Sequence, residues 1–248
     1  MKDIIKEFIV LVVTKLQLPR LISIIFRAIK FIIPSELKPK SKLELKLEDN
    51  LADETFNYFK EHFKKSVIFN DVLKIREYAI KTSLLNDKNK EYYYLEFGVW
   101  KGASANFFSK SVDKFYCFDS FEGLQEDWKG SQLSKGAFDL KKKIPKLKSN
   151  VEPIIGLVED TLDDFLKKHN PKINFVHLDM DTYPATIYAL ERLKPFFNKD
   201  AIIIFDELYN YPGWKDGEYK ALKEVFKDDE YIFKAFNTLG PEVVIQIK

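Results

Sequence analysis

The sequence predicts an α/β fold: a doubly wound, Rossmann-like sheet of seven mostly parallel strands that ends in an antiparallel hairpin, preceded by an N-terminal helical extension. Three observations lead to this prediction. From residue 91 onward, short β-rich runs alternate with helical stretches, as in βαβ units. All nine glycines lie at or after position 98, which places the tight turns in that part of the chain. The length of 248 residues fits one such domain plus a modest extension.

The individual elements follow from the hydrophobic periodicity of each segment. A helix over 70–85 leads into the sheet. After it we expect strands over 92–97, 115–118, 151–155, 173–179 and 201–205, helices over 103–112, 161–169, 183–197 and 218–226, and a hairpin of 231–236 and 242–247. The long segment 122–148 is polar and rich in lysine, which is typical of a loop or lid.

Residues 1–50 are expected to form an amphipathic helical extension with a polar connector around 41–50. Residues 51–248 then form the main domain, with 51–90 as its helical lead-in. The first forty residues are net basic, and the uncharged runs among them are shorter than the roughly 20 residues that span a bilayer. Two interpretations of the extension stay open. It packs on its own domain or on the second subunit of a homodimer, or residues 1–33 make a peripheral membrane contact.

Charge and cysteine content indicate which partners and which compartment to expect. Forty basic and 38 acidic residues give a net charge of +2, which does not favour binding to nucleic acid. The single cysteine, Cys117, allows no disulfide within the chain and indicates a reducing compartment. We therefore expect a cytoplasmic protein, with attachment to the inner face of the membrane as the alternative that the basic extension leaves open.

A glycine-containing loop after the first strand predicts a nucleoside site. Gly98 and Gly102 allow a sharp turn and a close approach of backbone N–H groups to a ligand. The pattern E-x-G-x-x-x-G, beginning at Glu96, differs from the G-x-G-x-x-G of dinucleotide-binding loops, which disfavours NAD. Asp119 follows Gly98 by 21 residues and ends the next strand, where a carboxylate can accept both hydroxyls of a ribose.

Four carboxylates lie at two later strand ends, Asp179 and Asp181 at one and Asp206 and Glu207 at the other. Carboxylates gathered at the ligand crevice repel each other unless a cation neutralises them, and oxygen ligands favour Mg²⁺. The structural alternatives are that Asp181 caps the following helix and that Asp206 and Glu207 only face solvent. His177, two residues before Asp179, is either a general base or a hydrogen-bonded structural histidine.

Four ordered motifs give the chain from about residue 92 onward a resemblance to class I S-adenosylmethionine-dependent methyltransferases, specifically the macrocin O-methyltransferase (TylF-like) family. The motifs are L-E-F-G-V at 95–99, F-D-S-F-E-G-L at 118–124, H-L-D-M-D-T-Y at 177–183, and F-D-E at 205–207 followed by N-Y-P-G-W at 210–214. The resemblance implies that S-adenosylmethionine is held by the loop from Glu96 to Ser104, with its ribose on Asp119 and its adenine near Gly156. It also places the metal ligands of the family on Asp179, Asp206 and Glu207.

The function predicted from these residues is methyl transfer from S-adenosylmethionine to a hydroxyl of a sugar, glycan or small molecule, assisted by Mg²⁺. Because a sulfonium methyl group is a strong electrophile, the enzyme mainly aligns the acceptor oxygen and removes its proton. Asp181 or His177 would take that proton, close to Asp179. One departure from the family is Glu207, where relatives often carry a second aspartate. The alternatives are a membrane-tethered, noncatalytic module on a nucleotide-binding fold, and an NAD-dependent oxidoreductase.

Overall fold

The computed structural model describes residues 40–87 and 89–248, and the chain divides into two compact units, Met1–Asn50 and Leu51–Lys248. The helices predicted before residue 40 lie outside the described residues. In the first unit, the stretch expected to be a connector is instead the beginning of helix α3 (Lys42–Phe63). Ser41 and Glu44 explain the difference, because each side chain accepts a hydrogen bond from the backbone N–H of the other, which is a capping box.

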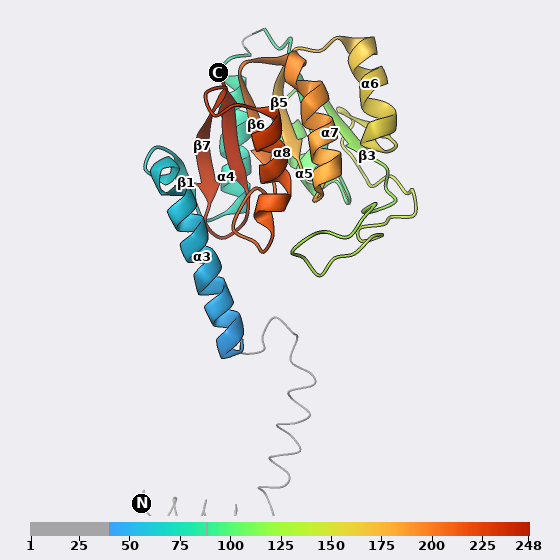
Figure 1. Ribbon diagram of the computed structural model, residues 1–248. Coiled ribbons are helices and arrows are strands. Elements are labelled where there is room, and N and C mark those ends of the chain that lie inside the picture. Colours follow the sequence, from blue (N-terminus) through green and yellow to red (C-terminus); the bar gives the residue numbers. More distant parts are fainter. Residues whose placement is uncertain (1–39, 88) are drawn as a thin grey trace, which may run out of the picture. The chain divides into compact units, whose positions relative to one another are not determined.

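The second unit is built on one eight-stranded sheet with the strand order β1-β7-β8-β6-β5-β2-β3-β4 (Figure 1). The strands are β1 (Val67–Phe69), β2 (Tyr93–Phe97), β3 (Phe115–Asp119), β4 (Val151–Ile155), β5 (Ile173–Leu178), β6 (Phe197–Phe205), β7 (Tyr231–Asn237) and β8 (Val243–Ile247). Only β8 runs antiparallel to its neighbours, β6 and β7. The predicted α/β class, the parallel centre and the C-terminal hairpin are therefore confirmed.

The number of strands differs from the prediction by one. Strand β1 pairs in parallel with β7, so the C-terminal hairpin lies inside the sheet and β1 forms its edge. Three residues between two helices are too few to produce a recognisable alternation. In addition, Val67 and Ile68 are about half exposed, so no buried face marks this strand in the sequence.

Helices cover both faces of the sheet. One face carries α4 (Val72–Leu84) and α5 (Ala103–Phe108), and the other carries α6 (Val158–His169), α7 (Tyr183–Leu193) and α8 (Glu218–Val225) (Figure 1). The part of α3 that belongs to the second unit packs on the latter face through Phe59, which is fully buried. Short 3-10 turns follow at Ser109–Ser111, Lys194–Phe196 and Trp214–Asp216. Within the described ranges, no helix is both long and apolar enough to cross a bilayer.

The order of the strands determines where a ligand can bind. The chain adds β3 and β4 on one side of β2 and then crosses to add β5 and β6 on the other side. In open α/β sheets, such a reversal leaves a crevice at the carboxyl ends of the strands. The segments that follow β2, β3, β4, β5 and β6 therefore converge, and they contain the motifs singled out in the sequence.

Candidate active site

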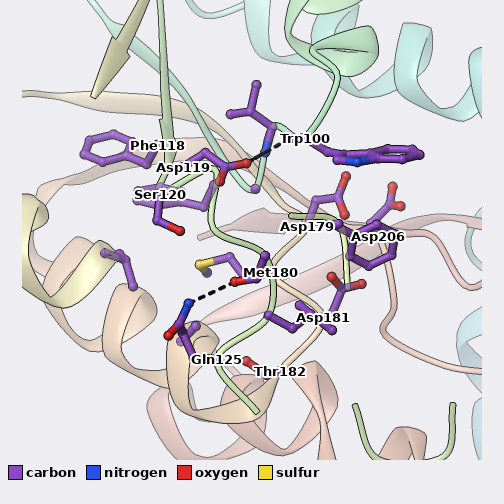
Figure 2. Close-up of a pocket in the computed structure, with 18 of the residues that line it drawn as sticks. Trp100, Phe118, Asp119, Ser120, Gln125, Asp179, Met180, Asp181, Thr182 and Asp206 are labelled. Atoms are coloured by element: carbon purple, nitrogen blue, oxygen red, sulfur yellow. Dashed lines mark hydrogen bonds between the residues drawn. The ribbon is translucent and has the colours of Figure 1, made fainter. Parts of the chain in front are cut away.

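A cavity of about 630 Å³ opens at the carboxyl ends of the central strands. Its lining includes the glycine loop after β2, Asp119 at the end of β3, the turn after β4, and the acidic ends of β5 and β6. In Figure 2, Asp119 and Ser120 lie on one side, and the carboxylates of Asp179, Asp181 and Asp206 lie together on the other. The cavity therefore joins the predicted nucleoside site to the predicted carboxylate cluster.

Asp119 holds the glycine loop in place. Its Oδ2 accepts hydrogen bonds from the backbone N–H groups of Val99 (2.7 Å) and Trp100 (2.8 Å), and its Oδ1 accepts one from Phe121 (2.6 Å). A carboxylate offers about four acceptor positions, so three are used within the protein. Asp119 can consequently take one ribose hydroxyl without losing these bonds, where the sequence suggested two.

The predicted cofactor residues separate into two groups. Gly98, Ser104, Asp119 and Gly156 line the cavity, whereas Glu96 and Gly102 do not. Glu96 is fully buried and bonded to His177, on the face of the sheet that α5 covers. The prediction that Glu96 contacts the cofactor directly is therefore wrong, because its side chain is buried and does not line the cavity.

Gly102 has a packing role instead. It has a φ of +76° at the N-terminus of α5, and a Cβ atom there would lie 2.7 Å from the side chain of Leu147. The glycine thus allows the segment around Leu147 to pack against the start of the helix.

Gly98 brings the ends of β2 and β5 into close contact. Its φ is +85°, and a Cβ atom there would lie 1.7 Å from the carbonyl oxygen of Asp179. On the same two strands, the N–H of Asp179 donates to the carbonyl of Phe97 (2.8 Å). The absence of a side chain at Gly98 is therefore what allows Asp179 to sit beside the glycine loop.

The carboxylates of Asp179, Asp181 and Glu207 each offer an oxygen within 4.8 Å of the others. Burial and the charge of nearby Asp206 raise the pKa of Asp179 and Glu207 well above the ordinary values. The same causes raise the pKa of Asp181 to about 7. Asp181 does not cap α7, because Thr182 occupies the N-cap position, and Glu207 is buried rather than facing solvent. The structural alternatives considered for these two residues therefore fail.

Asp206 differs from the other carboxylates because it is paired. Its Oδ1 accepts a hydrogen bond from Nη2 of Arg76 (2.7 Å) and lies 3.1 Å from Nε2 of His177. Burial alone would raise the pKa of Asp206, but the hydrogen bonds and charges of His177 and Arg76 hold it well below its usual range. Asp206 therefore favours the ionised form, whereas burial makes its neighbours Asp179 and Glu207 favour the protonated form.

His177 lies between two carboxylates and does not reach the cavity. The ring is fully buried, with Nδ1 2.7 Å from Oε1 of Glu96 and Nε2 on Asp206. Burial would lower the pKa of the imidazole, but the two carboxylates raise it to about 10. A general-base role for His177 is therefore wrong, because the ring is protonated near neutral pH and has no nitrogen free for a substrate.

The sequence reasoning missed three residues of this region. Arg76 comes from α4, where it shares a stripe with the buried Ile80, and a basic residue within an apolar stripe was the available signal. Glu218, at the start of α8, is fully buried, and its Oε2 accepts the backbone N–H of Glu207 (3.0 Å). Trp100 lines the cavity with 42% of its surface exposed. No sequence pattern marked the last two.

The segment expected to be a lid contacts the loop after β6. A Cβ atom at Gly130 would lie 1.4 Å from the carbonyl oxygen of Pro212, so the two backbones touch. Nearby, the rings of Trp128 and Tyr211 meet edge to face at 6.0 Å. Trp128 also lines the cavity, so this contact helps to fix the rim on the side of the carboxylates.

Comparisons with known proteins agree with this architecture. Residues 95–208 match a family model described as a methyltransferase domain (Methyltransf_24). A search of curated proteins found no match. Among solved structures, CalS11, a calicheamicin methyltransferase, is similar with a TM-score of 0.58 and 18% identity over 84% of this chain and 94% of that chain.

Two further structures share the fold. Another structure of CalS11, described as a TDP-rhamnose 3'-O-methyltransferase, has a TM-score of 0.53 and 18% identity over 84% of this chain and 96% of that chain. The O-methyltransferase NovP has a TM-score of 0.53 and 18% identity over 71% and 79% of the two chains. The domain match covers less than half of the chain, and the solved structures show that this chain shares the fold of these methyltransferases.

Proposed function

We propose that this protein transfers the methyl group of S-adenosylmethionine to a hydroxyl oxygen of a sugar or small molecule, next to a bound divalent cation. The observation that carries the proposal is one cavity in which the glycine loop and Asp119 adjoin the unpaired carboxylates of Asp179, Asp181 and Glu207. A nucleoside cofactor and an acceptor hydroxyl can therefore lie side by side.

The cofactor occupies the part of the cavity formed by Gly98, Ser104, Asp119 and Gly156. Asp119 accepts one ribose hydroxyl, and the turn at Gly156 adjoins the adenine. NAD is a poorer candidate, because Val99 and Trp100 stand where a dinucleotide loop needs small residues against the pyrophosphate.

Asp181 is the residue that accepts the proton of the acceptor hydroxyl. Its carboxylate lines the cavity, and its pKa of about 7 suits a base that works near neutral pH. Its backbone has a φ of +62°, a conformation that is uncommon for residues other than glycine and that recurs at functional sites. Asp181 also lies beside the two carboxylates that we assign to the cation.

Asp179 and Glu207 fit a divalent cation such as Mg²⁺. Glu207 is 7% exposed, and its Oε2 has no hydrogen-bond partner among the described residues. Two crowded carboxylates with raised pKa values form a donor set of hard oxygens, which suits Mg²⁺. When bound, the cation would lower the pKa of the acceptor hydroxyl and fix its direction.

A sugar is the acceptor class that the fold and the lining of the cavity favour. CalS11 is described as acting on TDP-rhamnose and NovP as an O-methyltransferase, and both share the fold of this chain. Trp100 and Trp128 line the cavity, and indole rings stack well on the faces of sugars and aromatic rings. The macrocin O-methyltransferase family fits the same chemistry.

The proposal is tested in two steps. Titration calorimetry should detect binding of S-adenosylhomocysteine but not of NAD, and the opposite result would exclude a methyltransferase. Transfer of label from methyl-labelled S-adenosylmethionine is then measured against a panel of nucleotide sugars and phenols. Asp181→Asn should lower the transfer rate by about 10²- to 10⁴-fold without changing cofactor affinity. The matched control is Asp229→Asn, on the exposed surface; equal rates for both variants would refute Asp181 as the base.

The partners and the location of the protein remain predictions. Membrane contact through residues 1–33 falls outside the described residues, the proposed homodimer depends on the same extension, and the cytoplasmic location rests on the single cysteine. Sedimentation of the full chain with anionic liposomes tests the membrane contact, and equilibrium ultracentrifugation tests the dimer.

A further inference from the structure

The segment between β3 and β4 carries a dense positive charge. Residues 129–148, which we call the basic loop, contain seven lysines and one acidic residue, Asp139, so the loop has a net charge of +6 where the whole chain has +2. All seven lysines are exposed, and among the described residues only Lys142 of the seven has a salt-bridge partner, Glu122 at 2.7 Å. The basic loop therefore presents six ammonium groups without a salt bridge. The seven lysines are Lys129, Lys135, Lys141, Lys142, Lys143, Lys146 and Lys148.

Hydrogen bonds hold the basic loop against the rest of the domain. Nδ2 of Asn106, on α5, donates to the carbonyl of Lys146 (2.9 Å), and Oδ1 of Asn106 accepts the N–H of Lys148 (2.8 Å). The N–H of Lys142 donates to the carbonyl of Phe121 (3.0 Å). The lysines are thus carried by a loop whose backbone is anchored to a helix and to the end of β3, so their charges form a surface of the domain.

This charged surface lies outside the cavity. Gln125, Trp128 and Phe138 from the same segment line the cavity, whereas none of the seven lysines, which all lie in the described part of the chain, does. In Figure 1 the segment, drawn in lime green, projects beyond the ends of the central strands. A ligand inside the cavity would therefore leave the lysines unused, and their partner lies outside the cavity, at its rim.

The composition of the basic loop fits an anionic lipid surface. Leu133 and Ile144 lie among the lysines and are 37% and 48% exposed. At a membrane surface, such apolar side chains enter the interface, while lysine stems lie along it and the ammonium groups reach lipid phosphates. The rest of the chain is net acidic, which disfavours a nucleic acid wrapped over a large surface but not a bilayer that touches one edge.

The chain enters the second unit at the same edge of the sheet. Glu54, near the start of this unit, forms a salt bridge with Lys215 in the segment that follows β6. That segment is also the one that Gly130 of the basic loop contacts, at Pro212. The forty residues that begin the chain contain eight basic and three acidic residues. The basic loop is therefore near the point where a second basic segment precedes the domain in sequence.

We propose that the basic loop binds an anionic membrane surface and brings the mouth of the cavity to that surface. Its ammonium groups contact lipid phosphates, and Leu133 and Ile144 enter the interface between the headgroups. The inference goes beyond the proposed function, because it concerns residues outside the cavity and does not depend on methyl transfer.

The experiment is sedimentation of the full-length protein with vesicles of phosphatidylcholine mixed with phosphatidylserine, and with vesicles of phosphatidylcholine alone, at roughly 0.1 M salt. The wild type should bind the anionic vesicles and not the neutral ones. Lys141→Gln/Lys142→Gln/Lys143→Gln should bind the anionic vesicles about tenfold or more weakly. The matched control, Lys167→Gln/Lys168→Gln/Lys172→Gln, removes three exposed charges where α6 ends and β5 begins, and should stay within about twofold of the wild type.

Several results would overturn the inference: no binding of the wild type to anionic vesicles, equal binding to neutral ones, unchanged binding of the basic-loop variant, or an equal loss in the control. Unchanged vesicle binding together with a raised KM for a phosphate-bearing acceptor would assign the lysines to that acceptor instead. Circular dichroism and S-adenosylhomocysteine binding check that each variant is folded. Loop-dependent vesicle binding without methyl transfer would count against the proposed function only, whereas methyl transfer without such binding would count against this inference only.

Discussion

Gly98→Ala is the substitution whose effect the structure defines most sharply. The added Cβ atom would lie 1.7 Å from the carbonyl oxygen of Asp179, whereas such contacts are essentially never shorter than 3.0 Å. The two backbones must therefore separate by roughly 1 Å or more. A misplacement of this size in the catalytic geometry costs about 10²-fold in rate. The φ of +85° adds a separate strain of about 1–2 kcal/mol, because only glycine adopts it freely.

The control variant is Gly136→Ala. Gly136 has a nearly identical φ of +84°, but a Cβ atom there meets nothing within 4 Å. Both variants should lose about 1–2 kcal/mol of unfolding free energy in urea titrations, since both incur the strain at φ. Only Gly98→Ala should lose more than this, together with about 10²-fold in methyl transfer. Equal stability and equal rates in the two variants would refute the claim that Gly98 positions Asp179.

Three further predictions concern the charged residues. Asp119→Ala should weaken S-adenosylhomocysteine binding by about tenfold or more in calorimetry, because the glycine loop loses its anchor; unchanged affinity would argue against the assignment. The rate of methyl transfer should rise as pH increases through about 7, where Asp181 deprotonates, and a profile flat from pH 6 to 8 would contradict that role. For His177, the folded pKa of about 10 exceeds the ordinary 6.5, so its contribution to stability is complete below pH 6.5 and is lost as pH rises toward 10. In EDTA, the unfolding free energy of His177→Gln should fall less steeply above pH 7 than that of the wild type. Equal slopes in the two proteins would show that His177 does not contribute in this way.

Much of the fold could be predicted because the central strands are buried on both faces. Residues 201–205 of strand β6 are buried throughout, and such strands appear in the sequence as short, continuous apolar runs. The predicted range 151–155 agrees fully with β4, and the other central strands differ from their predicted ends by at most four residues. β1 was missed because three residues, two of them about half exposed, carry no such signal. The capping box at Ser41 was overlooked because the stretch after it is rich in charge.

Site residues could be predicted from the sequence only where a reactive side chain comes directly after a strand. Asp179, Asp181, Asp206 and Glu207 were found because polar residues at the ends of apolar strands stand out. Their pairing could not be predicted, because it depends on contacts between distant segments. Arg76 and Asp206 are 130 residues apart in the chain. A periodic pattern locates a residue on a face of its own helix or strand, but it does not identify the side chain that this face meets.

The pairing pattern explains why neighbouring carboxylates have different roles. Glu96, His177, Asp206 and Arg76 form a continuous chain of hydrogen bonds in which two carboxylates alternate with two cations. This chain is close to neutral as a unit, so the carboxylates outside it are the ones left without a cationic partner among the described residues. Those carboxylates are the ones that can attract a divalent cation or accept a proton. The proposed positions of the cation and of the base therefore follow from which acids lack a cationic partner, and Arg76 and His177 supply that partner for Asp206.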